Sequence, residues 1–156
     1  MKTIEQWLGE YSLSHRNPVN KTLHWICIPP IVLAALGMFR ALPFGGALVN
    51  GASVAAALMF AYYLLLSWRL ALGAAAVLLA LYGVADLSWR ELGRAHLPAM
   101  LGLFGAAWAG QFAGHHLEGA KPSFFKDLQF LLIGPLWLLA AVYRRLDLPL
   151  RQPAPG

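Results

Sequence analysis

Charged residues are scarce in this chain. Asp, Glu, Lys and Arg together make up 12% of its 156 residues, while hydrophobic residues make up 59%. A soluble domain has roughly 25% charged residues, so this composition leaves too little polar surface for a soluble protein. The net charge of +5 suits anionic lipid headgroups, and the scattered basic residues argue against nucleic-acid binding. We therefore expect an integral membrane protein, and leave open a bacterial inner membrane or an endoplasmic-reticulum-like membrane.

Cysteine is almost absent as well. The one cysteine, Cys27, lies in the first apolar run, so the chain has no intrachain disulfide and gives no indication of a redox compartment. We interpret Cys27 as a small buried hydrophobic residue. GxSxG, P-loop, CxxC and HExxH patterns are missing too. Five histidines are too few for the eight-histidine di-iron boxes of membrane desaturases.

Long apolar runs fill most of the chain. We predict five hydrophobic helices, at about 23–39, 47–67, 70–87, 97–115 and 128–143. Each has roughly the 20 residues that cross a bilayer, and prolines should bend the first and the last. The predicted fold is an all-α integral membrane bundle of about five such helices plus an N-terminal amphipathic interfacial helix within residues 1–17. The whole chain, 1–156, should be one membrane domain.

The N-terminal segment has the pattern of an amphipathic helix that lies in the membrane interface. Its apolar stripe repeats at helical spacing and consists of Ile4, Trp7, Leu8 and Tyr11. Thr3 is a good N-cap, and His15 continues the stripe one turn after Tyr11. Asn17 and Pro18 then break the pattern, because Asn caps a helix and Pro favours its first turn. We expect a new helix from Pro18.

Three histidines lie at the ends of the predicted spans. His15 and His24 flank the start of the first span, and His115 ends the fourth. Because four spans end on the side where they began, we expect all three on one face of the membrane. The break at Asn17–Pro18 lets His15 and His24 converge, whereas one continuous helix would point them about 180° apart. Polar groups at membrane depth are costly and tend to persist where they function, so we predict a metal site.

Neighbouring polar residues complete this predicted site. Gln111, His115 and Glu118 form one helical stripe, whereas His116 is turned about 100° away from it. Neutral imidazole binds iron, zinc and copper. Ring nitrogens that do not bind metal need acceptors, which Gln111, Asn20 or Glu118 can provide. The identity of a fourth ligand stays open between Glu118, His116 and water.

Two patterns in the chain resemble the signatures of a known family. The first is Tyr11-x3-His15-x4-Asn20-x3-His24, followed by Pro29. The second is Gln111-Phe112-x-Gly114-His115-x2-Glu118, followed by Lys121-Pro122-Ser123. Both are similar to those of small membrane 2-hydroxy fatty acid dioxygenases, a family that includes the fungal endoplasmic-reticulum enzyme of phytosphingosine breakdown. The resemblance covers nearly the whole chain and is weakest over residues 40–100.

The resemblance implies a function. A member of this family is an iron(II)-dependent dioxygenase that shortens long-chain 2-hydroxy fatty acids by one carbon (alpha-oxidation), with O2 and without 2-oxoglutarate. Its iron ligands correspond here to His15, His24 and His115. A 2-hydroxy carboxylate has the oxygens to chelate the metal, and the acyl tail would stay among the helices near membrane lipid. Apart from the resemblance, charge and hydrogen bonding suggest residues for the substrate. Tyr11 can donate a hydrogen bond or a proton, and Lys21, Lys121 or Arg16 can neutralise the carboxylate.

Other interpretations stay open. A haem protein could use His24 and His115 as axial ligands. A non-enzymatic lipid-binding protein would need its histidines only for bonds to neighbours. Zinc in place of Fe2+ would favour hydrolysis over oxidation. His96, at a predicted loop edge, we interpret as an ordinary hydrogen-bonded or solvated side chain.

Overall fold

The computed structural model describes residues 2–119 and 124–150, and gives the backbone alone for 124–129. Seven helical elements follow one another: α1 (Ile4–Leu13), α2 (Pro18–Arg40), α3 (Gly51–Leu66), α4 (Trp68–Leu92), the short 3-10 helix η1 (Gly93–Ala95), α5 (His96–Glu118) and α6 (Phe124–Arg145). The described residues contain no strand, and extended backbone pairs only at the isolated bridge between Gly45 and Asn50. The predicted all-α class is confirmed.

Each predicted apolar segment overlaps one of the helices α2 to α6. Among the described residues, two helical stretches are long and apolar enough to cross a membrane, Pro18–Arg40 and Trp68–Glu118. The second stretch consists of α4 and α5, which meet at a turn at η1, where Gly93 has φ 50°. The third and fourth predicted segments are thus separate helices, and α4 continues to Leu92, past the predicted end at residue 87. An ion pair between Asp86 and Arg90, one turn apart, supports α4 in this polar region.

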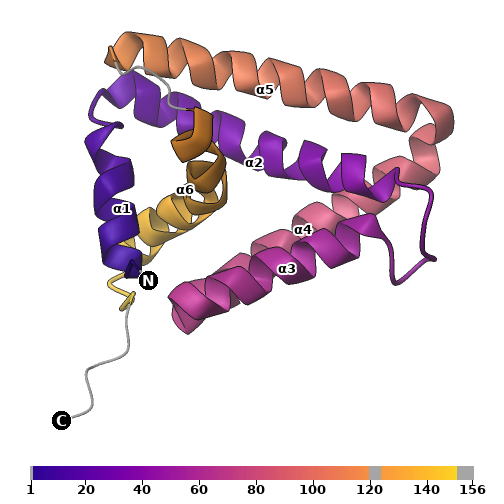
Figure 1. The fold of residues 1–156 in the computed structure, drawn as a ribbon, viewed down its shortest axis with the longest axis horizontal. Coiled ribbons are helices and arrows are strands. Elements are labelled where there is room, and N and C mark those ends of the chain that lie inside the picture. Colours follow the sequence, from indigo (N-terminus) through magenta and orange to yellow (C-terminus); the bar gives the residue numbers. More distant parts are fainter. Residues whose placement is uncertain (1, 120–123, 151–156) are drawn as a thin grey trace.

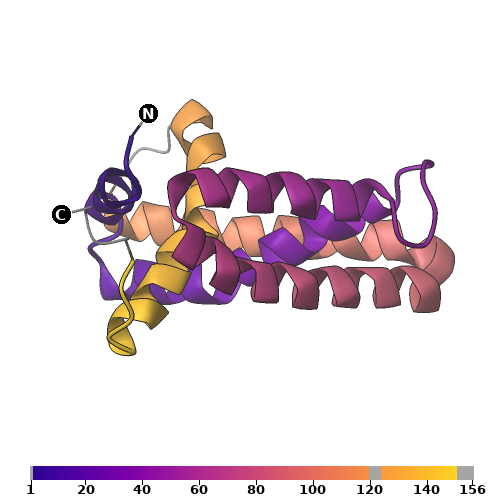
Figure 2. The same ribbon diagram turned by 90° about the horizontal axis from the view of Figure 1, so that it is seen from below.

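Helix α2 lies at the centre of the arrangement. It runs alongside α5 over much of its length and also contacts α3, α4 and α6 (Figure 1). Helices α3 and α4 form a hairpin, because Ser67 between them is extended; Figure 2 shows the pair side by side. Helix α6 lies beside α1 near the start of α2. The N-terminus lies at the far end of α1, away from the start of α2 (Figure 1).

Helix α1 forms as its sequence predicts, but its apolar face packs on the protein itself. A capping box closes its start, with the Gln6 backbone N–H donating to Thr3 Oγ1 at 3.3 Å and the Thr3 N–H donating to Gln6 Oε1 at 2.8 Å. The indole Nε1–H of Trp137 in α6 donates to Ser12 Oγ at 3.0 Å. The buried members of the stripe are Ile4, Leu8 and Tyr11. The stripe expected to rest in the membrane interface is thus covered largely by α6.

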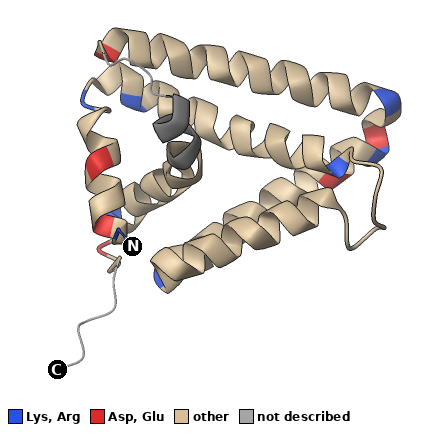
Figure 3. Ribbon diagram, viewed as in Figure 1, with Lys and Arg blue, Asp and Glu red and all other residues tan. Residues whose placement is uncertain are grey.

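Charged side chains avoid the middle of the long helices. Figure 3 shows Lys, Arg, Asp and Glu near the helix ends and the connecting segments of α2 to α5. One such group, Arg40, Asp86 and Arg90, joins the C-terminal ends of α2 and α4. The opposite end of α2 carries the histidines. The molecule therefore has two polar ends separated by a long apolar middle.

Candidate metal centre

His15 lies in the link between α1 and α2, at a break that the sequence dictates. Asn17 caps α2, its side-chain oxygen accepting from the Val19 N–H at 2.8 Å. Pro18 takes the first helical position, where its missing N–H leaves no hydrogen bond unmade. The His15 side chain is 2% exposed and stacks on Tyr11, with ring centroids 4.1 Å apart. The break thus turns this histidine inward, as predicted.

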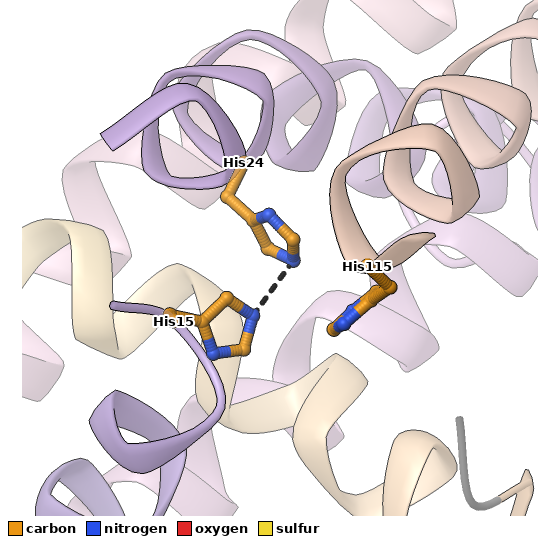
Figure 4. Close-up of side chains that lie close together, drawn as sticks. All are labelled: His15, His24 and His115. Carbon is orange, nitrogen blue, oxygen red and sulfur yellow. Dashed lines mark hydrogen bonds between the residues drawn. The ribbon is translucent and has the colours of Figure 1, made fainter. Parts of the chain in front are cut away.

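Three histidines from distant parts of the chain meet here. His24, from the second turn of α2, is 1% exposed, and its ring centroid lies 4.2 Å from that of His15. The His115 ring, at the end of α5, lies 5.2 Å from His15 and 5.0 Å from His24. Figure 4 shows the three rings facing one space. Their ligand atoms all lie within 4.8 Å of one another, so this group could hold a metal ion.

The hydrogen bonds of His15 and His24 leave a place for a cation. Nδ1 of His15 lies 2.6 Å from the Tyr11 carbonyl oxygen, and Nδ1 of His24 lies 2.9 Å from the Asn20 carbonyl oxygen. A carbonyl only accepts, so each Nδ1 carries the proton and donates it. In neutral rings both Nε2 atoms then present lone pairs, yet they lie 2.9 Å apart. A metal ion bound by both nitrogens would remove this repulsion.

Protonation of His15 does not relieve this repulsion at neutral pH. Burial lowers the pKa of His15 to about 4, although its hydrogen bond to the Tyr11 carbonyl acts in the opposite direction. At neutral pH the ring is therefore uncharged, the form that binds metals. Holding Nδ1 in a hydrogen bond also fixes the ring's orientation. The donor set thus fits a metal that prefers imidazole nitrogen.

Glu118 is not one of the converging groups. Its Oε1 accepts from the Arg16 N–H at 2.8 Å, and its Oε2 accepts from the Asn17 N–H at 2.9 Å and from Asn20 Nδ2 at 3.0 Å. The carboxylate thus ties the end of α5 to the link that carries His15 and to the start of α2. Both oxygens of Glu118 accept hydrogen bonds from the protein, and its part as a metal ligand or as a supporting acceptor stays a prediction.

Backbone carbonyls, rather than the predicted side chains, accept from the rings of His15 and His24. Asn20 supplies the carbonyl for His24, while its side chain binds Glu118. Each histidine uses the carbonyl four residues before it, so the spacings from Tyr11 to His15 and from Asn20 to His24 carried this signal. Sequence reasoning sought side-chain acceptors and missed it.

Other predicted site residues do not line the histidine cavity. Lys21 and His116 are exposed. They follow Asn20, which is buried, and His115, which lines the cavity, and each is therefore turned about 100° around its helix. Lys121 lies outside the described residues. The roles of these residues at a bound metal or substrate stay predictions.

A close contact between α2 and α5 depends on a glycine. A Cβ atom at Gly114 would lie 2.3 Å from Asn20 Oδ1, closer than atoms can pack. Only glycine lets the helices approach here, one residue before His115 and at the level of Asn20. Sequence reasoning recorded Gly114 within a pattern without recognising this role.

The histidines open into a small cavity next to a larger one. The histidine cavity has a volume of about 50 Å³ and is also lined by Tyr11 and Gln111. The larger cavity, of about 190 Å³, has an almost wholly apolar lining from α2, α3, α4 and α6. Ile28 lines both, and Gly134 and Pro135 line one each. A polar and an apolar compartment therefore adjoin.

An all-helical, apolar chain with a buried three-histidine group defines a class: helical proteins with a candidate metal site at one end of the bundle. Comparison with known proteins narrows this class. The chain belongs to the Mpo1-like family, described as 2-hydroxy-palmitic acid dioxygenase Mpo1-like, whose sequence model matches residues 1–146. No curated protein and no solved structure matches the chain. The resemblance stated from the two sequence patterns is confirmed, and the family name indicates a 2-hydroxy fatty acid dioxygenase.

Proposed function

We propose that this protein is an iron(II)-dependent membrane dioxygenase that shortens long-chain 2-hydroxy fatty acids by one carbon. The observation that carries this proposal is the convergence of His15, His24 and His115, with two facing Nε2 atoms 2.9 Å apart. Family membership supplies the reaction class, since the family is named for a dioxygenase of 2-hydroxy-palmitic acid.

The outward face of the helices supports a membrane location. Several large apolar side chains on α3, α4 and α5 are more than half exposed: Leu58, Leu65, Leu72, Leu79 and Leu101. Exposed apolar side chains in this number are typical of contact with a membrane or a partner. Because the same helices carry their charges near their ends (Figure 3), we assign this surface to lipid. A substrate with a long acyl chain would reach the protein through that lipid.

Iron suits the reaction class better than zinc, because zinc has no redox chemistry. When bound, iron(II) would activate O2 and polarise the substrate. His15, His24 and His115 would hold it and leave further coordination positions free. The Tyr11 and Asn20 carbonyls hold two of the rings in place, and Glu118 fixes the link that carries His15. The apolar parts of the cavity wall, such as Ile31 and Leu131, would limit access of water.

The proposed overall reaction balances without a further reductant. A 2-hydroxy acid and one O2 give the acid one carbon shorter, CO2 and water. The C1–C2 bond breaks, C2 is oxidised from an alcohol to a carboxyl carbon, and C1 leaves as CO2. These changes release the four electrons that reduce O2. Neither 2-oxoglutarate nor an electron donor is therefore required.

The larger cavity offers a place for the acyl tail. It adjoins the histidine cavity at Ile28, and its walls include Val32, Leu78 and Leu138. A hydrocarbon chain would be stabilised there by about 0.8 kcal/mol for each buried CH2 group. Ile28→Trp should partly close the junction and lower turnover of 2-hydroxypalmitate more than that of a short 2-hydroxy acid.

The direct test is product analysis. Full-length protein is purified without oxygen in the presence of iron, its metal content is measured, and 2-hydroxypalmitate is added with air. We expect the fatty acid one carbon shorter, detected by mass spectrometry, and retained iron near one ion per chain. Iron-loaded protein that leaves 2-hydroxypalmitate unchanged would contradict the proposal.

The alternatives have distinct signatures in the same preparation. A haem protein would show a Soret band, although a cavity of about 50 Å³ is small for a macrocycle. Retained zinc would indicate a hydrolase. Protein that keeps no metal yet binds fatty acids would be a lipid-binding protein.

A further inference from the structure

Gln111 places a side-chain amide in the wall of the histidine cavity. The residue is 4% exposed and lies one helical turn before His115. An amide side chain both donates and accepts hydrogen bonds. It can therefore pair with a polar ligand bound in this cavity.

Trp108 presents a second polar group on the same face of α5. Its indole Nε1 is buried and unpaired in the described part of the chain. The other atoms in this condition there are Asn20 Oδ1 and Arg69 Nε, and neither residue lines the histidine cavity. By contrast, the buried indole of Trp137 donates to Ser12 Oγ at 3.0 Å.

Trp108 and Gln111 are three residues apart and His115 follows four residues later, so the three form one stripe along α5. All three line the same cavity. A cavity-lining amide and a buried, unpaired indole N–H thus lie on the helix face that carries a candidate metal ligand. A buried donor without a partner calls for an explanation, and a ligand that accepts from it is one. Among the described residues that line this cavity there is no Lys or Arg. An anionic ligand would meet neutral hydrogen-bond donors here rather than a cationic side chain.

We propose that Gln111 and Trp108 bind the head group of the substrate, an inference that rests on the proposed function. The Trp108 Nε1–H and the Gln111 amide N–H groups donate to the carboxylate oxygens. The Gln111 amide oxygen accepts the hydrogen of the 2-hydroxyl group. This pair selects a 2-hydroxy carboxylate over a fatty alcohol, and Gln111 selects it over an unsubstituted fatty acid. These residues take the carboxylate-binding role that the sequence assigned to lysines.

The test measures binding rather than turnover. Full-length iron-loaded protein is kept without oxygen, where no reaction occurs, and is titrated calorimetrically in detergent with 2-hydroxypalmitate, palmitate and 1-hexadecanol. The variants are Gln111→Leu and Trp108→Phe. The control is Trp68→Phe, because Trp68 is exposed at the start of α4 and lines neither the histidine cavity nor the larger cavity. Circular dichroism and metal analysis accompany each sample.

A hydrogen bond to a charged group is worth enough to change affinity by about tenfold or more. Trp108→Phe should weaken both acids about tenfold and keep the preference for 2-hydroxypalmitate. Gln111→Leu should weaken 2-hydroxypalmitate more than palmitate and so reduce that preference. Binding of 1-hexadecanol, and all binding by Trp68→Phe, should be unchanged, as should iron content.

The proposed function and this inference fail in different measurements. Wild-type protein that binds no 2-hydroxypalmitate contradicts the function and the inference with it. Wild-type binding that both variants retain in full overturns the inference alone. Equal weakening of 2-hydroxypalmitate and 1-hexadecanol overturns it too, since that pattern means lost packing. Lost iron in either variant also overturns it, since the residue would then support the metal.

Discussion

Two ends of this molecule bury histidines, and they use them differently. At the end formed by α2, α4 and α5, His96 is fully buried, with Nε2 2.9 Å from the Gly37 carbonyl oxygen and Nδ1 3.1 Å from Ser88 Oγ. Both of its ring nitrogens thus have a protein partner. At the other end, His15 and His24 each use one nitrogen on a carbonyl and turn the second toward the other ring. Histidines are buried at both ends. His15 and His24 differ from His96 because one ring nitrogen of each faces another imidazole rather than a carbonyl or hydroxyl group.

The carboxylates of the two ends differ in the same way. Asp86 pairs with Arg40 at 2.8 Å and with Arg90 at 2.5 Å, so opposite charges meet directly. Glu118 instead accepts from two backbone N–H groups and the amide of Asn20. The ion pairs of Asp86 join the ends of α2 and α4, whereas the hydrogen bonds of Glu118 hold the short link that positions His15. We therefore expect changes at the two ends to separate stability from metal binding.

The largest expected effect is at the histidine group. His15→Ala, His24→Ala and His115→Ala should each reduce retained metal to less than about a tenth of the wild-type amount, because a site with two imidazoles holds divalent metals far more weakly. His96→Ala should retain metal fully. Metal analysis of protein purified without a histidine tag decides this, and full metal retention by the triple variant would remove the proposed site.

The next effect concerns the two carboxylates. Glu118→Gln places an amide N–H2 group where the link offers N–H donors, so His15 should be held less firmly and metal affinity should fall about 10–100-fold. Asp86→Asn is the matched change at the other end and should leave affinity unchanged while lowering stability. Competition with a chelator measures both. Equal affinities in the two variants would show that Glu118 does not position the site.

A smaller effect is expected from His96 on stability. His96→Ala removes the imidazole partner of the Gly37 carbonyl, which keeps the Ala41 N–H, and the partner of Ser88 Oγ. Loss of these two bonds should lower the free energy of unfolding by about 1–3 kcal/mol. Thermal unfolding in detergent, followed by circular dichroism, measures the loss. An unchanged unfolding temperature would mean that water replaces the imidazole. His96 would then have no stabilising role to compare with the histidines of the candidate metal centre.

The smallest effects separate two glycines of α5. Gly105→Ala meets no atom within 4 Å and should be neutral or stabilising by up to about 1 kcal/mol, the difference in helix propensity. Gly114→Ala, 2.3 Å from Asn20 Oδ1, should instead destabilise by about 1 kcal/mol or more through overpacking. Paired unfolding curves test the sign. Stabilisation by both changes would show that α2 and α5 can separate at no cost.

Much of the fold was predictable because its signals are local. The capping box at Thr3, the helix start at Pro18 and the long apolar runs each follow from residues a few positions apart. Helix α4 runs past its predicted end at residue 87, because polar residues were taken as the end of the helix, whereas the Asp86–Arg90 pair stabilises its last turns. The burial of the α1 stripe against α6 was missed because its partner lies more than 100 residues away.

The candidate site divides in the same way. Counting spans predicted that His15, His24 and His115 would meet, and they do. The unpaired indole N–H of Trp108 has no sequence signal, because it depends on whether another helix places a hydrogen-bond acceptor beside it. The role of Glu118 depends on the same packing, since its partners are backbone groups of the link before α2.

The sequence by itself determined the helices, their apolar character and the break that lets two histidines turn inward, because these depend on near neighbours along the chain. Only the tertiary structure decided which ring nitrogens have a hydrogen-bond partner in the protein. It also decided which carboxylate binds the backbone of the link before α2 and which buried indole N–H has no partner among the described residues. The physical reason is that a hydrogen bond depends on distance and direction between groups brought together by packing, and residue order does not contain either.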